Sequence, residues 1–535
     1  MSERRIPQAT QLVDLALNAG VHLFHSPEGD PYVVLEAQGH RETWLIASRS
    51  FRLWLQGRYY TTTKGTPNAQ ATQDAIGVLE SRARYDGTCE PVFTRVAEHQ
   101  GGIYLDLADE AWRVVAITAD GWTVRDEPSV RFRRPQAMRP LPLPERGGRL
   151  DLLRELVNLD DDGWILVAGW LLGTLRPNRP HAVLGIHGEQ GTGKSNQGAM
   201  LRGIVDPNTA DLRSPPREEI DLVLAAVNGW IVGYDNVSSL PEWLTDALCR
   251  LSTGAGLSRR LLYTNDEEKV FAVKRPVIFT AITEIAVRGD LCDRTIAVTL
   301  PRFTAYRTED ALWSAFYAAR PRILGALLDA AAVALRNVGT TSLVTPPRMA
   351  DFATWVVAGE PGLGWKPGTF LGAYDKNRES SRQVTLEASA IGQAVLTFMR
   401  ARSDWKGNAK QLLGELEGSV DEATRRDRHW PQGEGGPRAL GGKLRAIAPD
   451  LRAVGLDAEF HERLGSLKRQ WTLSWSSQDA RGPADGPGTV GANGKTPAHS
   501  SPSPGGDGRD GELLPFRSEG DICWQCGEQP HAGAC

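Results

Sequence analysis

What the sequence lacks excludes several classes of protein. None of its 535 residues belongs to an apolar run approaching the about 18 residues that cross a bilayer, so we expect no membrane span. The N-terminal stretch lacks the apolar segment and small-residue cleavage site of a secretory signal. Six cysteines among 535 residues are too few for a secreted protein that depends on disulfide bonds for stability. These absences predict an intracellular protein without membrane contact.

The sequence also lacks a strong excess of charge of either sign. It contains 61 Lys and Arg residues and 65 Asp and Glu residues, which gives a net charge of −4. Binding of polyanions by the chain as a whole is therefore not implied, although local basic patches remain possible. The 41% hydrophobic and 24% charged residues are typical of globular proteins, and the length suits three or four domains.

Changes in pattern along the chain divide it into segments. Short apolar runs between polar turns predict an N-terminal α+β domain, and a run rich in Pro and Arg predicts an extended linker. Toward the C-terminus, helices followed by alternating residues outline a winged helix-turn-helix, and a stretch rich in Gly, Pro and Ser predicts a disordered tether. The segments are 1–130 (α+β domain), 131–149 (linker), 150–305 (α/β core with a parallel sheet between helices), 306–394 (helical, interrupted at Pro321), 395–476 (winged-helix-like), 477–516 (tether) and 517–535 (tail).

A glycine-rich motif predicts a phosphate site. It fits the pattern G-x-x-x-x-G-K-[ST], follows an apolar run suited to a buried strand, and is placed where a helix can begin. In this setting loop N–H groups and the helix dipole bind phosphates, Lys194 reaches the β- and γ-phosphates, and the Ser195 hydroxyl coordinates Mg²⁺. We therefore expect ATP and Mg²⁺ as ligands. The residues of the motif are Gly188, Glu189, Gln190, Gly191, Thr192, Gly193, Lys194 and Ser195.

Two further apolar strands supply other polar groups of such a site. The strand 229–235 ends in Asp235, which we expect to hold Mg²⁺ through water, and the strand 275–280 ends in a polar sensor, Thr280. Asn236 stands where Glu or Asp would polarise the attacking water, so either hydrolysis is slow or another carboxylate supplies the base. The alternative bases are Glu189, Glu218 and Glu219.

An arginine beyond the sensor strand is a candidate for contact with a neighbouring subunit. Arg294 is our choice for an arginine finger that reaches the γ-phosphate bound to that subunit, and Arg288 is the second choice. The alternative is that Arg294 simply pairs with Asp290 or Asp293.

The order of these motifs resembles that of superfamily 3 helicases. These are AAA+ ring ATPases of small viruses, with relatives of the poxvirus primase-helicase type in phages and mobile elements. The resemblance covers about residues 150–305, including the segment 251–257, and it extends loosely to the helical and winged-helix segments that follow. It implies a P-loop AAA+ core, a homo-oligomeric, hexameric ring, and single-stranded or forked DNA as substrate. It further implies a role in replicating a phage or mobile element in the cytoplasm of a bacterial host.

Superfamily 3 helicases carry a β-hairpin that projects into the central pore, and residues 256–280 have the length for it. Family hairpins present Lys or His at the tip, whereas the tip here, 264–269, is mostly acidic and would repel phosphate. The alternative is a hairpin face that meets only solvent. The expected DNA contacts on its flanks are Arg259, Arg260, Lys269 and Lys274.

The tail has the spacing C-x₂-C-x₄-H-x₃-C, which resembles the zinc knuckles of retroviral-type nucleocapsids with one residue fewer before the last Cys. It predicts a closed tetrahedral Zn²⁺ site, against the alternative of a disordered tail with incidental cysteines. Trp524 beside the first ligand would stack on an unpaired base, or the knuckle would bind a protein instead. The predicted ligands are Cys523, Cys526, His531 and Cys535.

Two functions remain open at this point. The first is a ring-forming, ATP-dependent DNA helicase or translocase whose N-terminal domain recruits a partner protein or an origin. The second is a nucleotide-gated oligomeric ATPase, such as a helicase loader or a phage-defence or regulatory module, that does not move along DNA. Asn236 and the acidic hairpin tip favour the second, whereas the hairpin length and the appended DNA-binding elements favour the first.

Overall fold

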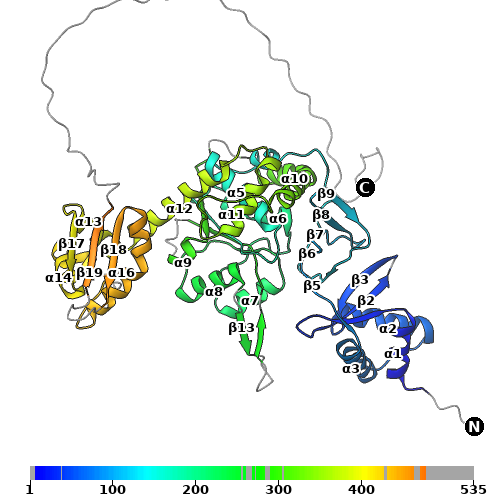
Figure 1. Ribbon diagram of the computed structural model, residues 1–535. Coiled ribbons are helices and arrows are strands. Elements are labelled where there is room, and N and C mark those ends of the chain that lie inside the picture. Colours follow the sequence, from blue (N-terminus) through cyan, green and yellow to red (C-terminus); the bar gives the residue numbers. More distant parts are fainter. Residues whose placement is uncertain are drawn as a thin grey trace, which may run out of the picture. The chain divides into compact units, whose positions relative to one another are not determined.

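The computed structural model of the protein describes most of the chain up to residue 476 (Figure 1). The chain separates into two units, Met1–Ala480 and Arg481–Cys535. The predicted tether and the tail, with Cys523, Trp524, Cys526, His531 and Cys535, lie outside the described residues. The described residues are 6–37, 39–254, 257–260, 268–271, 273–282, 289–303, 307–426, 430–462 and 470–476.

The chain begins with a four-stranded sheet and three helices. The strand order is β3-β2-β1-β4, with β1 parallel to β4 and the other pairs antiparallel. Alternate residues of β2, Val33 and Leu35, share a core with Leu12, Leu55 and Leu79 of the helices, as the period of two in a strand requires. The elements are α1 (Gln8–Asn18), β1 (His22–His25), β2 (Pro31–Ala37), β3 (His40–Leu45), α2 (Arg49–Thr63), α3 (Ala69–Tyr85) and β4 (Thr88–Cys89).

A second sheet follows within the segment that the sequence predicts to be one α+β domain. It is an antiparallel meander in the order β6-β7-β8-β9, beside the short parallel pair β5 and β10. The N-terminal region therefore builds two four-stranded sheets. The elements are β5 (Val92–Phe93), β6 (Val96–His99), β7 (Gly102–Asp106), β8 (Val114–Thr118), β9 (Gly121–Arg125) and β10 (Arg131–Phe132).

The Pro- and Arg-rich segment 131–149 begins with β10 and then packs along the fold. Backbone N–H groups of Arg139, Leu141 and Glu145 donate to carbonyl oxygens of Pro207 (3.0 Å), Leu107 (2.8 Å) and Pro321 (3.0 Å), respectively. The Leu141 side chain is buried. The linker thus joins the N-terminal region to the helices that follow.

A buried ion pair also joins the N-terminal region to the rest of the fold. Arg95 and Asp206 are both fully buried, and Arg95 Nε lies 3.1 Å from Asp206 Oδ1. The other Asp206 oxygen accepts from the backbone N–H groups of Trp230 and Ile231, each at 2.9 Å. Burial raises the pKa of Asp206, but Arg95 and Arg202 outweigh burial and the net pKa is lowered. Asp206 therefore remains ionised and satisfied in the interior.

The central domain, residues 150–388, is built on a parallel sheet in the order β12-β15-β11-β16. All residues of β11, β12 and β15 are buried, as expected for parallel strands covered on both faces. One face packs on α5, α6 and α10, and the other packs on α7 and α8. The elements are α4 (Asp151–Arg154), α5 (Asp161–Thr174), β11 (Val183–His187), α6 (Lys194–Val205), α7 (Glu219–Val227), β12 (Val232–Tyr234), α8 (Glu242–Thr253), β15 (Val277–Ala281), α9 (Gly289–Cys292) and β16 (Thr295–Thr299).

The long helix α10 (Glu309–Asn337) contradicts the interruption that the sequence predicts at Pro321. It runs through the proline without a break. Buried residues lie on both sides, among them Phe316, Ile323 and Leu327, so packing of both halves offsets the backbone hydrogen bond that proline removes. The helices that follow are α11 (Ala350–Gly359), the 3₁₀ helix η1 (Glu360–Leu363) and α12 (Thr369–Ala388).

The C-terminal domain, residues 390–476, is a small α/β unit with its own core. Its antiparallel sheet has the order β17-β19-β18, and Leu412, Leu440 and Trp471 are among its buried residues. Two elements, β17 and α15, were not predicted. The elements are α13 (Ala390–Met399), β17 (Asp404–Gly407), α14 (Ala409–Ser419), α15 (Glu422–Arg426), α16 (Gly436–Ala453), β18 (Leu456–His461) and β19 (Gln470–Trp475).

Among the helices of the described residues, none is both long and apolar enough to cross a membrane.

Candidate nucleotide site

The glycine-rich loop 188–195 joins the end of β11 to the start of α6, where the sequence predicts it. Gly188, Gly191 and Gly193 have φ values of 153°, 84° and 77°, which side chains rarely tolerate. A Cβ atom at Gly193 would also lie 3.0 Å from the ring of Phe303. The curl of the loop therefore depends on its glycines.

Lys194, the first residue of α6, is held over the loop. Its Nζ donates to the carbonyl oxygens of Gly188 and Glu189, each at 2.7 Å. Burial lowers the pKa of Lys194, and the nearby Asp235 carboxylate opposes this effect. The ammonium group thus contacts the loop and is close enough to Asp235 to be influenced by its charge.

Three predicted polar side chains converge beside the loop. Ser195 Oγ donates to Asp235 Oδ1 at 2.8 Å, and Thr280 Oγ1 donates to the same oxygen at 2.5 Å. The sheet order explains the convergence, because β15 lies between β11 and β12, and the carboxyl ends of parallel strands meet at one edge. Thr280 is buried while Ser195 is exposed, so the cluster opens to solvent on the side of the loop.

The backbone at Asn236 gives a reason for its residue type. Asn236 has a φ of 52°, in the left-handed region where Asn is the most favoured residue after Gly. Its N–H donates to Thr280 Oγ1 at 2.8 Å, which fixes this conformation. A Glu in the same position would be strained, so the turn itself favours the amide.

The three carboxylates considered as alternative bases have partners. Glu219 pairs with Arg250 at 2.8 Å, and Glu218 forms a capping box with Asp221 at the start of α7. Glu189 accepts from Arg302 Nε at 2.6 Å. Glu189 is the one of the three that belongs to the loop, and Arg302 holds its carboxylate.

Arg302 was not predicted as a site residue. It follows β16, and the backbone N–H of the nearby Leu300 donates to the His187 carbonyl at 2.8 Å, which brings this segment beside the start of the loop. The feature of the sequence that could have identified Arg302 is its position directly after the fourth apolar strand. A cation at that place lies at the same edge of the sheet as the loop.

Arg294 lies at the opposite edge of the sheet. The Val183 N–H at the start of β11 donates to the Arg294 carbonyl at 2.9 Å, so Arg294 is separated from its own loop by the length of a strand, roughly 16 Å. Its guanidinium contacts Asp290 Oδ2 at 2.6 Å, and its side chain is 13% exposed. The pairing with Asp290 that was the alternative is therefore present. Arg288 lies outside the described residues.

The expected hairpin is formed by β13 (Leu257–Arg260) and β14 (Glu268–Phe271), which pair antiparallel with Arg259 opposite Lys269 and Arg260 opposite Glu268. Most of its acidic tip lies outside the described residues. Lys274 lies after the hairpin and donates to the Asn178 carbonyl at 2.8 Å. The ammonium group of Lys274, a predicted DNA contact, is therefore bound to the segment between α5 and β11.

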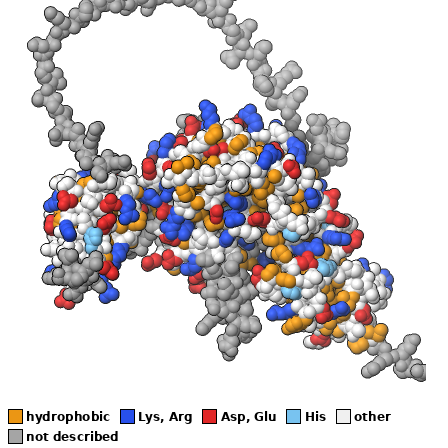
Figure 2. All heavy atoms as spheres, viewed as in Figure 1, with side chains coloured by type: hydrophobic (Ala, Val, Ile, Leu, Met, Phe, Trp, Pro, Cys, Tyr) orange, Lys and Arg blue, Asp and Glu red, His pale blue; other side chains and the backbone are white. Residues whose placement is uncertain are grey.

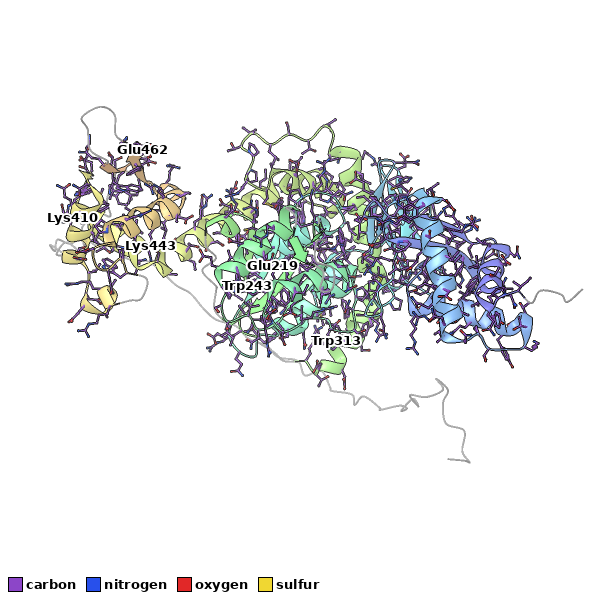
Figure 3. All side chains as sticks on the ribbon, turned by 90° about the horizontal axis from the view of Figure 1, so that it is seen from below. Glu219, Trp243, Trp313, Lys410, Lys443 and Glu462 are labelled. Atoms are coloured by element: carbon purple, nitrogen blue, oxygen red, sulfur yellow. The ribbon has the colours of Figure 1, made fainter. Side chains whose placement is uncertain are left out.

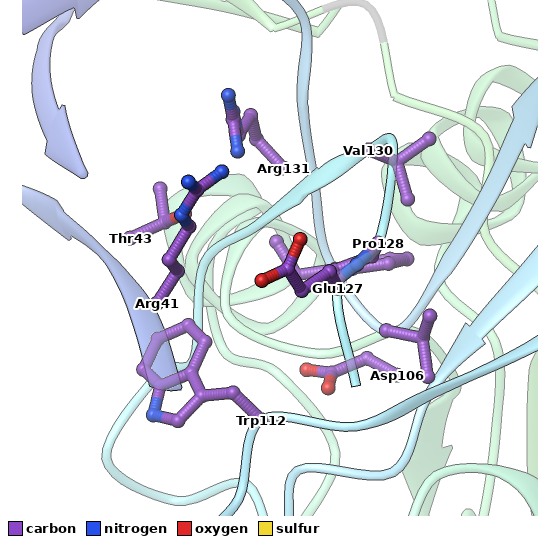
Figure 4. A pocket seen from close by; sticks show the side chains of 10 residues that line it. Arg41, Thr43, Asp106, Trp112, Glu127, Pro128, Val130 and Arg131 are labelled. Atoms are coloured by element: carbon purple, nitrogen blue, oxygen red, sulfur yellow. The ribbon is translucent and has the colours of Figure 1, made fainter. Parts of the chain in front are cut away.

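A pocket elsewhere, between the two N-terminal sheets, contains none of the predicted site residues (Figure 4). Arg41, Asp106, Trp112 and Arg131 are among its lining residues. Asp106 pairs with Arg134 at 2.6 Å, and Arg131 pairs with Glu90 at 3.1 Å. Asp106 and Arg131 are thus engaged in ion pairs beside the pocket. Within the described ranges no cluster of three or more His, Cys, Asp or Glu side chains could hold a metal ion.

Two solved structures are similar to the chain. SCCmec type IV Cch, described as an active helicase, aligns at 12% identity with a TM-score of 0.41, over 77% of this chain and 89% of that chain. The C-terminal region of NrS-1 aligns at 12% identity with a TM-score of 0.37, over 87% of this chain and 99% of that chain. No curated protein matches the chain.

Two family models match separate segments of the chain. Residues 150–364 match the replication protein of actinomycete integrative conjugative elements, and residues 391–487 match the C-terminal domain of the same protein, RepA. The first match begins where the sequence predicts the α/β core, and the second begins within α13 of the C-terminal domain. Over these two segments, which together cover more than half of its length, the chain belongs to the replication proteins of actinomycete integrative conjugative elements.

Proposed function

We propose that the central domain is a P-loop AAA+ ATPase of the superfamily 3 type, which drives a ring-forming DNA helicase in the replication of a mobile element. The observation that carries this proposal is the convergence of Ser195, Asp235 and Thr280 beside the glycine-rich loop. The family of the chain supplies the replication role.

The residues of this site fit Mg²⁺ and ATP. The Ser195 hydroxyl and the Asp235 carboxylate lie 2.8 Å apart, a hard-oxygen pair of the kind that Mg²⁺ takes together with water and phosphate oxygens. The N–H groups of the loop and Lys194 would hold the phosphates. Bound Mg²⁺ would neutralise charge that develops on the transferred phosphoryl group.

Asn236 defines how this site differs from a fast ATPase. An amide can orient the attacking water but cannot accept its proton. Glu189, the carboxylate within the loop, is paired with Arg302, and it would act as the base only if it turned toward the attacking water. We therefore expect slow basal hydrolysis that rises when a ligand or a neighbouring subunit rearranges this pair.

DNA contacts are proposed for two parts of the chain. The first is the β13–β14 hairpin, in which Arg259 is opposite Lys269. The second is the C-terminal domain, whose order α13, β17, α14, α15, α16, β18, β19 resembles that of a winged helix-turn-helix with the short helix α15 added. Lys410 of α14 and Lys443 of α16 belong to this domain (Figure 3). The hairpin would follow single-stranded DNA through a hexameric ring, and the winged helix would add affinity.

The tail is proposed to bind one Zn²⁺ through Cys523, Cys526, His531 and Cys535. Deletion of residues 517–535 should remove one zinc per chain by elemental analysis and leave ATP hydrolysis intact. If Trp524 stacks on a base, Trp524→Ala should weaken single-strand binding by about 1–3 kcal/mol while zinc stays bound. A full chain that contains no zinc would contradict the metal site.

The decisive test measures ATP hydrolysis with and without single-stranded DNA, together with strand displacement on a forked duplex. A helicase should hydrolyse ATP faster with DNA and displace the strand, and Lys194→Ala should do neither. ATP hydrolysis that is indifferent to DNA, with ATP-dependent oligomerisation, would favour the second function, a nucleotide-gated assembly module. The specific observation for that second function is the left-handed Asn236.

A further inference from the structure

The helix α2 of the N-terminal region presents a face with cations and no carboxylates. Its sequence contains Arg49, Arg52 and Arg58, ends on Lys64, and includes neither Asp nor Glu. All four basic residues are exposed. This local excess contrasts with the rest of the chain, where charges of both signs are interspersed, as on the face seen in Figure 2.

The cations of α2 share one side of the helix with two large exposed side chains. At 3.6 residues per turn, Arg49, Leu53, Tyr60 and Lys64 line one stripe, with Arg52 at its border. Leu53 and Tyr60 are each 55% exposed. The helix is anchored from another side by Phe51, Leu55 and Tyr59, all buried. A surface of this composition is available to a partner.

Within the described part of the chain, Arg49, Arg52 and Lys64 form no ion pair. By contrast, Arg82 on the neighbouring helix α3 lies 3.7 Å from Asp86. Arg58 is placed over the Trp54 ring at 5.6 Å, away from the stripe. Uncompensated cations on adjacent turns repel one another, so their arrangement favours a polyanionic partner.

The end of the helix adds a second observation. Lys64 adopts a φ of 56° and donates its N–H to the Tyr60 carbonyl at 2.9 Å, as the left-handed cap of α2. This position usually holds Gly, and Gly65 comes directly after it. Lys64 thus occupies a position where a side chain strains the backbone, and it places a cation at the end of the stripe.

We propose that this face of α2, the α2 basic face (Arg49, Arg52, Leu53, Tyr60 and Lys64), binds double-stranded DNA. The helix is about 22 Å long from Arg49 to Lys64, and an α-helix fits the major groove of B-DNA, whose phosphates flank the groove on both sides. Single strands instead favour grooves with stacking platforms. The inference rests on the proposed function in that the chain acts on DNA, and it names duplex DNA as the ligand of the N-terminal region.

The test measures binding of the full chain to a fluorescent DNA duplex by anisotropy, without nucleotide, across a range of salt concentrations. The variant Arg49→Gln/Arg52→Gln should bind about tenfold more weakly near 0.1 M salt, and the slope of log K against log salt should fall by about 2, since each phosphate contact contributes about 0.9. The matched control, Arg82→Gln/Arg84→Gln on α3, removes the same charge and should change neither quantity.

The conservative variant Arg49→Lys/Arg52→Lys should retain the slope, and equal melting temperatures would show that all variants fold. An unchanged slope in Arg49→Gln/Arg52→Gln would overturn the proposal. An equal loss of duplex affinity in the control Arg82→Gln/Arg84→Gln would also overturn it, because that loss would reflect net charge. The proposal would equally fail if Arg49→Gln/Arg52→Gln lost as much affinity for a single-stranded oligonucleotide. If the wild-type chain binds no DNA, the proposed function fails; if it binds but the variant matches it, only the α2 basic face is wrong.

Discussion

The two edges of the central sheet are organised in opposite ways. At the carboxyl edge, Ser195, Asp235 and Thr280 contact one another beside a loop that opens to solvent. At the amino edge, the guanidinium of Arg294 is bound to Asp290 and largely covered. The first edge is assembled within one chain, whereas the second must release an ion pair before its arginine can reach another subunit.

The amino edge contains further arginines around the same carboxylates. Asp290 also pairs with Arg348, and Asp293 pairs with Arg382 at 2.7 Å. Arg294 therefore shares Asp290 with a second guanidinium, which would still hold this carboxylate if Arg294 were released. This arrangement makes the release of Arg294 less costly than the loss of an isolated buried partner.

The largest expected effect tests the role of Arg294. If it reaches the γ-phosphate of a neighbouring subunit, Arg294→Ala should reduce ATP turnover by about 10³–10⁵ while nucleotide binding is retained. Steady-state hydrolysis and titration with a fluorescent nucleotide measure the two quantities. Arg348→Ala is the control, because it removes the other partner of Asp290. Normal ATP turnover in Arg294→Ala would show that Arg294 serves only to pair with Asp290.

A smaller effect is expected at the carboxyl edge from Lys194→Ala. Loss of the ammonium should lower turnover by about 10²–10³ and, unlike Arg294→Ala, should also weaken nucleotide binding. The same two assays measure it. Lys376→Ala, which removes a surface lysine paired with Asp162 at 3.2 Å, is the control and should match the wild type. Tight nucleotide binding by Lys194→Ala would show that this edge does not hold the phosphates.

The hydroxyl of Thr280 should have an effect smaller again. Thr280→Val keeps the shape but removes the donor to Asp235 and the acceptor for the Asn236 N–H. A hydrogen bond to a charged group is worth about 1.5–3 kcal/mol, so hydrolysis should fall by about 10–100-fold. Thr280→Ser keeps the hydroxyl and should retain most of the rate. Equal rates of ATP hydrolysis for Thr280→Val and Thr280→Ser would show that the Thr280 hydroxyl does not contribute to the site.

The last effect concerns stability and not turnover, at a carboxylate that contacts the amino edge from the C-terminal domain. Burial raises the pKa of Asp450 to about 6, Arg382 opposes this, and Asp293 adds to it. Because the folded state holds the proton more tightly, Asp450 stabilises the fold below about pH 4, and this contribution is lost as the pH rises to about 6.

The free energy of unfolding should therefore change with pH in a way that Asp450→Asn removes. From pH 4 to pH 7 the wild type should lose up to about 3 kcal/mol relative to Asp450→Asn, measured by urea unfolding. Asp457→Asn is the control, since Asp457 pairs with Arg452 at 2.9 Å nearby in the same domain. Identical pH profiles for the wild type and Asp450→Asn would show that Asp450 ionises normally.

The elements around the glycine-rich loop could be predicted because their signals are contiguous. The apolar run before the loop is β11, and α6 begins at Lys194, where a helix was expected. Asp235 and Thr280 end apolar strands, and parallel pairing alone then brings them to the same edge. Local sequence and the geometry of one sheet are sufficient here.

Other contacts could not be predicted because they depend on tertiary packing. Arg95 and Asp206 are 111 positions apart, and no local pattern pairs them. Division of the N-terminal region into two sheets depends on which short strands pair. Continuity of α10 through Pro321 depends on packing that outweighs a local helix breaker. The role assigned to Arg294 also stays a prediction, because it concerns a second copy of the chain.

The helix α6 links the nucleotide loop to the buried ion pair that joins the N-terminal region to the central domain. Its first residue, Lys194, lies over the loop, and Asp206, which caps its other end, holds Arg95. The helix is about 18 Å long and stiff on that scale. A displacement of the loop would therefore be transmitted along the helix axis to the Arg95–Asp206 ion pair. The position of the N-terminal region would then depend on which nucleotide the loop holds.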